Sequence, residues 1–114
     1  MGTRREWTEA EVVVLCAIFV TLGFAAGDDE RPECRKIAAV LQRSRGTIDR
    51  QWRNVKDYLA NLECKKVGDS VKYWAEVALM NPAVIKKLAA YYCHTYGWAL
   101  TDLLEKEDGT SENS

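Results

Sequence analysis

One uninterrupted apolar run limits what this chain can fold into more than any other feature. Residues 12–20 (VVVLCAIFV) are all apolar, but this run is far shorter than the about 20 residues that a membrane-spanning helix needs. Before the run, Thr8 and Glu11 have the spacing of a capping box, which predicts a helix from Glu9 to about Leu22 that ends at Gly23. Because this helix is apolar on nearly every side, it should be largely buried.

Two more helices with a short connection are predicted between residues 32 and 59. The first begins at Pro32, and its apolar residues recur at helical spacing: Cys34, Ile37, Ala38 and Leu41. A tight connection, Gln42 and Arg43, leads to Ser44, which is expected to cap the second helix, residues 44–59. That helix carries one apolar seam, formed by Ile48, Trp52, Val55 and Leu59.

The second half of the chain is expected to be helical as well. A helix over residues 71–80 follows two candidate caps, Asp69 and Ser70, and should turn Trp74 inward together with Val77 or Ala78. Asn81 and Pro82 then begin a helix that stops at Gly97. Its expected apolar stripe consists of Val84, Ile85, Leu88, Ala89 and Tyr92. A short helix from about residue 98 to residue 105 follows.

The predicted fold is therefore all-α, with a three-helix core of the helix-turn-helix type and two or three further C-terminal helices. The expected organisation is a flexible basic arm (1–6), the core (7–60), a helical extension packed on the core (61–106) and a disordered tail (107–114). A chain of 114 residues, 47% hydrophobic and 29% charged, has the size and composition of one soluble domain.

Charge is distributed unevenly along the chain, although the net charge is only −1. Residues 34–56 contain seven basic residues and one acidic residue, whereas residues 57–114 contain six basic and nine acidic residues. A basic stripe on an acidic body is the local feature that contact with phosphates requires.

The helix over residues 44–59 has the pattern of a helix that enters the major groove of double-stranded DNA. Its apolar seam turns Arg50 outward with Arg53 and Asn54 on either flank. Arg50 is a candidate reader of guanine and Asn54 of adenine, while basic side chains and Ser44 at the helix start suit phosphates. The candidate DNA-contacting residues are Arg43, Ser44, Arg45, Thr47, Arg50, Arg53, Asn54 and Lys56. The Arg4-Arg5 arm is a weaker candidate for the minor groove.

Two other interpretations of the same residues stay open. A charge-rich helix face is commonly just a solvated surface, in which Asp49 and Asp57 pair with Arg53 one turn away. Alternatively, the chain is a protein-interaction or dimerisation adaptor that binds a partner, or a second copy, through residues 70–105. Exposed aromatics at Tyr91, Tyr96 and Trp98 would serve that docking face.

Several of these segments resemble a Myb/SANT-type repeat. They are Trp7-Thr8-Glu9-Ala10-Glu11, Cys34-Arg35-Lys36-Ile37-Ala38, Arg43-Ser44 and Gln51-Trp52-Arg53-Asn54. The resemblance implies three helices held by three spaced aromatics, with the third helix reading DNA. Here Trp7 and Trp52 match the first and third aromatics, whereas Cys34 stands in the middle place and the loop before it is longer than usual.

A second resemblance covers roughly residues 5–92. The chain is similar to the helical domain found N-terminal to HNH nuclease domains in prokaryotic proteins of restriction type. The shared features are a WT-x-x-E opening, the R-[ST]-x-G-[ST]-[IV] pattern over residues 43–48, Trp74-Ala75-Glu76 and Asn81-Pro82. This resemblance implies a DNA-recognition domain, regulatory or serving to target a restriction-type system.

Catalytic and metal sites are not expected. The four cysteines (Cys16, Cys34, Cys64 and Cys93) lack the paired spacing of a zinc site, and buried thiols explain them better. Cys93 and the one histidine, His94, are neighbours that point about 100° apart on a helix and so form no dyad. We therefore expect a non-enzymatic protein without a cofactor or membrane span, cytoplasmic in a prokaryote or nuclear in a eukaryote.

Overall fold

The computed structural model describes residues 6–22, 32–61, 63 and 67–105. These residues contain helices and no strands, which confirms the all-α prediction. The helices are α1 (Glu9–Leu22), α2 (Pro32–Leu41), α3 (Arg45–Ala60), α4 (Asp69–Met80), α5 (Pro82–Tyr96) and α6 (Thr101–Leu104). Residues 1–5 of the expected arm (1–6), the loop before α2 and the expected C-terminal tail (107–114) lie outside the described residues.

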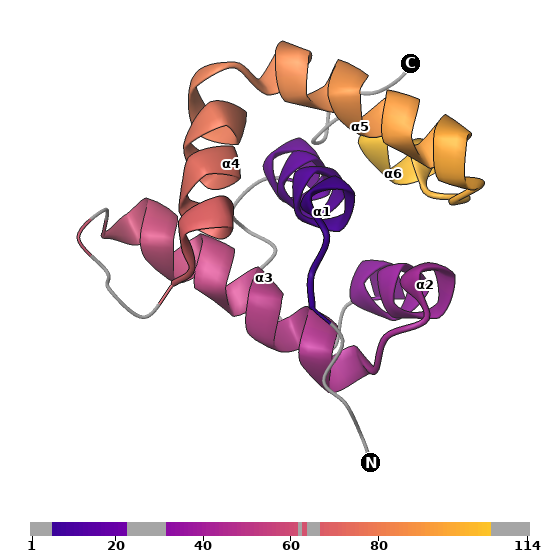
Figure 1. Cartoon of the computed structure of the whole chain (residues 1–114), viewed down its shortest axis with the longest axis horizontal. Helices are drawn as coiled ribbons and strands as arrows, with labels where there is room; N and C mark the ends of the chain where they lie inside the picture. The colour runs from indigo at the N-terminus through magenta and orange to yellow at the C-terminus, as the bar shows by residue number, and fades with distance from the viewer. Residues whose placement is uncertain (1–5, 23–31, 62, 64–66, 106–114) are drawn as a thin grey trace.

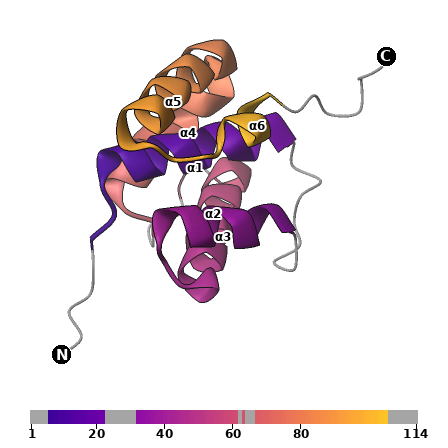
Figure 2. The same ribbon diagram turned by 90° about the vertical axis from the view of Figure 1, so that its right-hand side faces the viewer.

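Helix α1 occupies the centre of the molecule (Figure 1) and is largely buried, as its apolar sequence predicted. It packs most extensively on α5, then on α4 and α6, and least on α3. Helix α2 packs on α3. Figure 2 shows α1 between the layer of α4 and α5 and the layer of α2 and α3. Leu15, Ile18 and Phe19 are completely buried, and each such side chain contributes about 1.5–3 kcal/mol relative to exposure. The two halves of the chain thus share one hydrophobic core.

The predicted capping box at the start of α1 is present. The Thr8 backbone N–H donates to Glu11 Oε1 at 2.9 Å, and the Glu11 backbone N–H donates to Thr8 Oγ1 at 3.2 Å. Two N–H groups that a helix start leaves without partners are satisfied in this way. The side chain of Glu11 is consequently held at the N-terminal end of α1.

The connection between α2 and α3 is a left-handed turn at Gln42, whose φ is 59°. The Arg43 N–H donates to the Ala38 carbonyl at 3.0 Å and the Gln42 N–H to the Ala39 carbonyl at 3.3 Å, which together form a Schellman motif. Ser44 then caps α3 as predicted, since its Oγ accepts the Thr47 N–H at 3.1 Å. This short turn determines where the first residues of α3 lie.

Three details of the second half differ from the sequence prediction. Helix α4 begins at Asp69 after Gly68, without a side-chain cap, so neither Asp69 nor Ser70 is the N-cap. Val84 was expected on the buried stripe of α5 but is 57% exposed, because Ile85, Ala89 and Cys93 make the contact with the core. The last helix is shorter than expected. Within the described residues, no helix combines the length and the apolar character needed to cross a bilayer.

Candidate nucleic-acid interface

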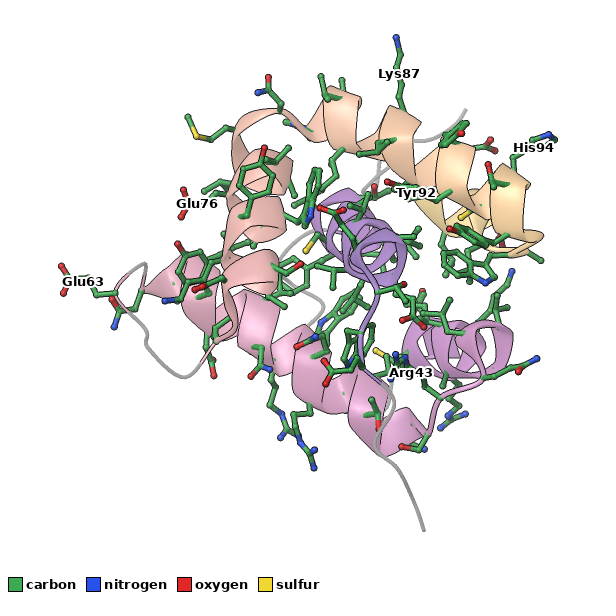
Figure 3. The ribbon with its side chains drawn as sticks, in the orientation of Figure 1. Arg43, Glu63, Glu76, Lys87, Tyr92 and His94 are labelled. Carbon is green, nitrogen blue, oxygen red and sulfur yellow. The ribbon has the colours of Figure 1, made fainter. Side chains whose placement is uncertain are left out.

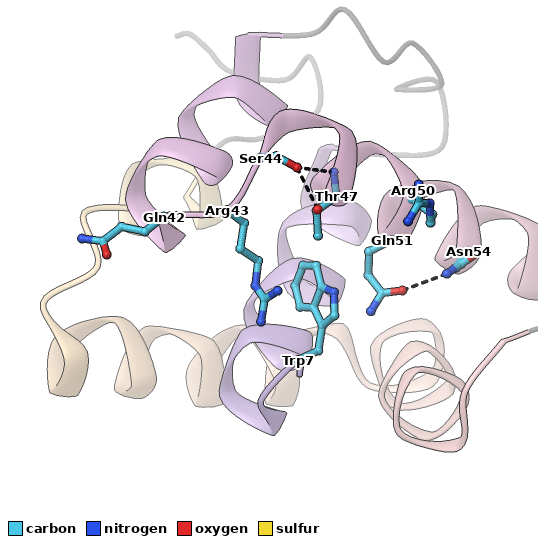
Figure 4. A pocket seen from close by; sticks show the side chains of 8 residues that line it. All are labelled: Trp7, Gln42, Arg43, Ser44, Thr47, Arg50, Gln51 and Asn54. Carbon is cyan, nitrogen blue, oxygen red and sulfur yellow. Dashed lines mark hydrogen bonds between the residues drawn. The ribbon is translucent and has the colours of Figure 1, made fainter. Parts of the chain in front are cut away.

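A groove of about 470 Å³ lies between α3 and the segment that precedes α1 (Figure 4). We call it the Trp7 groove. It is lined by Trp7, Gln42, Arg43, Ser44, Thr47, Arg50, Gln51 and Asn54. Five of these residues belong to the candidate DNA-contacting set, so the structure brings much of that set together on one side of α3.

Helix α3 presents three different faces. Ile48, Trp52 and Val55 are buried as the seam predicted, and Leu59 is half-buried. Residues of the Trp7 groove follow at i, i+3, i+4 and i+7, namely Thr47, Arg50, Gln51 and Asn54. On the other flank, outside the groove, the exposed basic residues are Arg45, Arg53 and Lys56. The outward side of α3 therefore has Arg50 near its centre, amides along one flank and cations along the other.

Arg43, one of the candidate DNA-contacting residues, is engaged within the protein. Its Nε and Nη2 donate to the two carboxylate oxygens of Glu11 at 2.9 and 2.8 Å, and Nη2 also donates to the Glu6 carbonyl at 2.7 Å. The guanidinium carbon lies 4.3 Å from the centre of the Trp7 ring. The Arg43 side chain is 5% exposed, so it belongs to the wall of the groove and joins α1 to the α2–α3 turn.

The contacts with Arg43 and Thr8 lower the pKa of the Glu11 carboxyl. Burial by itself raises the pKa of Glu11, but the hydrogen bonds from Arg43 and Thr8 and the Arg43 charge together outweigh it, so the pKa lies below the ordinary 4.5. Glu11 is therefore ionised at neutral pH. The pair is a buried ion pair in which both Glu11 oxygens accept from Arg43, with further hydrogen bonds from Thr8 and to the Glu6 carbonyl, and such bonds help to offset the cost of burying the two charges.

Gln51 was not singled out by the sequence analysis. Its side chain is turned inward and the residue is only 8% exposed, yet it lines the Trp7 groove beside Trp7 (Figure 4). Gln51 Oε1 accepts a hydrogen bond from Asn54 Nδ2 at 2.9 Å. The i, i+3 spacing of a glutamine and an asparagine in a predicted helix is a signal that could have found this pair.

Two residues of the basic stretch over residues 34–56 have acidic side chains close to them. Lys36 pairs with Asp102 of α6 at 2.6 Å, and Arg45 lies 3.8 Å from Asp49 within α3. At the start of α3, Ser44 Oγ and Thr47 Oγ1 are 2.8 Å apart and share a hydrogen bond. Arg50 and Lys56 remain exposed on α3.

Exposed large hydrophobic residues occur on α4 and α5. Among the described residues they are Tyr73, Leu79, Met80, Val84, Tyr91 and Tyr96. Trp98, in contrast, is half-buried and stacks on Tyr96 with ring centres 4.9 Å apart. Figure 3 shows Tyr92 turned toward α1, whereas Lys87 and His94 point away from α5 into solvent.

Comparisons of this chain with protein-family models, with curated proteins and with solved structures found no match. The likeness to Myb/SANT repeats and to nuclease-associated helical domains thus rests on the sequence motifs alone. Among the described residues, no three His, Cys, Asp or Glu side chains are grouped as ligands of a metal ion would be.

Proposed function

We propose that this chain is a non-catalytic module that binds double-stranded DNA through a helix-turn-helix formed by α2 and α3, with α3 in the major groove. The observation that carries the proposal is the outward side of α3. There Arg50 stands between the amide-lined Trp7 groove and the exposed cations Arg53 and Lys56. Base edges are read by arginine and amide side chains, and phosphates are bound by flanking cations.

The dimensions of α3 agree with this docking. Its 16 residues span about 24 Å, and an α-helix with side chains is about 10–12 Å across. The major groove of B-DNA is about 12 Å wide and admits such a helix. The α2–α3 turn and the Trp7 segment lie at one end of α3, so they add contacts to the backbone of the duplex without crossing the groove.

The residues divide into two classes in this proposal. Arg50 and Asn54 contact base edges, and each well-formed bidentate contact discriminates against a wrong base by about 1–3 kcal/mol. Arg45, Arg53 and Lys56 contact phosphates, which gives affinity without sequence preference. Arg43 has no direct part, because Glu11 already binds its guanidinium.

Fluorescence anisotropy with a labelled random-sequence duplex tests the proposal directly. Binding is expected at low salt and should weaken steeply as salt rises, since each phosphate contact releases counterions. Lys87→Ala is the matched control, because Lys87 is an exposed cation of α5 that points away from α3 (Figure 3). Absence of binding to any duplex at low salt would remove the proposal.

The exposed apolar residues of α4 and α5 favour a second candidate function, a dimerisation or protein-interaction surface. Met80 is 75% exposed and Tyr91 62%, and exposed apolar patches on soluble proteins commonly mark contact sites. Size-exclusion chromatography with light scattering tests it. A dimer that Met80→Lys dissociates supports this function, and a monomer at all concentrations argues against self-association. The two functions are compatible, because a dimer would present two copies of α3.

A further inference from the structure

We propose that Gln51 positions the Asn54 amide so that this chain requires an adenine, read in the major groove, within its DNA site. The inference rests on the proposed DNA-binding function and adds to it the base that one residue recognises. It also assigns a role to a buried glutamine that never touches DNA itself.

A hydrogen bond to Gln51 orients the side-chain amide of Asn54. Asn54 Nδ2 donates to Gln51 Oε1 at 2.9 Å, and both side chains line the Trp7 groove. Gln51 is 8% exposed, while Asn54, one turn further along α3, is half-buried at the edge of the groove. A buried acceptor has few rotamers, so it holds the partner amide in one orientation. Figure 4 shows the two side chains joined in this way next to Trp7.

The chemistry of the carboxamide explains why the tether selects adenine. An asparagine amide has two N–H donors and one carbonyl acceptor, and Gln51 occupies one donor. The second N–H and the carbonyl remain as a donor–acceptor pair. Adenine displays the complement in the major groove, an N7 acceptor beside an N6 amino donor.

The other bases do not fit a tethered amide. Guanine displays two acceptors, so its O6 would face the Asn54 carbonyl, whereas thymine offers one acceptor and a methyl group, and cytosine offers only an amino donor and leaves the Asn54 N–H without an acceptor. Without the bond to Gln51, the amide could turn its N–H group toward the acceptors of guanine or thymine and discriminate less. The Gln51 acceptor therefore changes specificity more than it changes affinity.

Two substitutions at position 51 separate positioning from packing. Gln51→Leu has similar size and removes the acceptor, so Asn54 loses its orientation. Gln51→Glu keeps an acceptor for the Asn54 N–H. The added negative charge weakens binding to all duplexes alike, but the preference for adenine should persist. Thermal unfolding of both variants verifies that the fold is retained.

The experiment uses a duplex enriched from a random pool by the full chain, with each adenine replaced in turn by 7-deazaadenine. This analogue lacks the N7 acceptor but keeps base pairing. At one position the replacement should weaken binding of the unmodified protein by about tenfold or more. That penalty should vanish in Asn54→Ala, fall several-fold in Gln51→Leu and persist in Gln51→Glu.

The possible results distinguish a failure of this inference from a failure of the proposed DNA-binding function. If no duplex is bound at low salt, the DNA-binding function fails and the inference fails with it. If duplexes are bound but Asn54→Ala leaves every 7-deazaadenine penalty unchanged, adenine reading by Asn54 is overturned while the function stands. If Asn54→Ala abolishes the penalty but Gln51→Leu keeps it in full, the positioning role of Gln51 is overturned.

Discussion

Arg43 and Glu11 are joined by two hydrogen bonds, at 2.9 and 2.8 Å, that link the α2–α3 turn to the first turn of α1. Glu11 also accepts the Thr8 N–H, so one carboxylate caps α1 and anchors the turn that precedes α3. The Trp7 ring packs on the same guanidinium. The position of α3 relative to the central helix thus depends on an ion pair at the base of the Trp7 groove.

We predict that Arg43→Met destabilises the fold by about 3–5 kcal/mol, because it leaves the Glu11 carboxylate buried without its partner. Urea unfolding measures the change. The double variant Glu11→Gln/Arg43→Met should be less destabilised than Arg43→Met, since it buries no charge. Arg45→Ala is the control, because Arg45 itself is exposed and its nitrogen lies as far as 3.8 Å from the Asp49 carboxylate, so this contact should matter by less than about 1 kcal/mol. Equal losses in Arg43→Met and Arg45→Ala would refute the anchoring role.

Low pH should weaken the ion pair between Arg43 and Glu11. The pKa of Glu11 is lower in the folded state than the ordinary 4.5, so its stabilising contribution is complete well above pH 4.5 and is lost as the pH falls toward the folded value. Unfolding free energies measured between neutral and acidic pH should therefore fall more steeply in the unmodified protein than in Glu11→Gln. Parallel pH profiles for the two proteins would contradict a lowered Glu11 pKa.

Replacing the left-handed residue of the α2–α3 turn should stabilise the protein. Gln42 has a φ of 59°, where an L-residue costs about 1–2 kcal/mol and glycine does not. After the extra entropy of a glycine in the unfolded chain, Gln42→Gly should gain about 0.5–1 kcal/mol in urea unfolding. Ala39→Gly, at an exposed position inside α2, should instead lose about 1 kcal/mol. A loss in both variants would contradict strain at Gln42.

Loss of the Ser44 cap should destabilise α3 more than the same substitution at Ser70 destabilises α4. Ser44→Ala removes the acceptor of the Thr47 N–H and should cost about 0.5–2 kcal/mol. Ser70→Ala should cost little, because Ser70 lies within α4 and does not cap it. Thermal unfolding of the two variants distinguishes them, and similar shifts would show that Ser44 is no better a cap than Ser70.

The two arginines on the outward side of α3 should behave differently toward DNA. Arg53→Ala should weaken binding to all duplexes alike and reduce the salt slope of log K by about 0.9, the loss of one phosphate contact. Arg50→Ala should instead relax preference at a guanine position. Anisotropy titrations over several salt concentrations, on an enriched and a random duplex, measure both effects. A sequence-dependent loss in Arg53→Ala would reverse these assignments.

Much of the fold was predictable from local signals. The capping box at Thr8 and Glu11, the Ser44 cap, and Pro82 with Gly97 at the ends of α5 each lie within a few residues of the boundary they determine. The cap of α4 was mispredicted because two polar residues near its start looked equally suitable, and the backbone placed Gly68 there instead. The exposure of Val84 was missed because periodicity alone does not say which side of an apolar stripe meets the core.

The candidate site was predictable in part. The outward position of Arg50, Arg53 and Lys56 follows from the apolar seam of α3, which is a property of helical spacing. The bond between Gln51 and Asn54 follows from their i, i+3 spacing, but the burial of Gln51 beside Trp7 depends on how the segment before α1 packs on α3, which the spacing does not reveal.

The sequence by itself determined the approximate ends of α1, α2, α3 and α5 and that the apolar run of α1 must be buried, because these properties depend on residues within one or two turns. Only the tertiary structure decided which members of the basic stripe are available to a partner. Arg43 pairs with Glu11, 32 positions away, and Lys36 with Asp102, 66 positions away. Such pairs form when packed helices bring distant charges together, and the order of residues along the chain does not encode that distance directly.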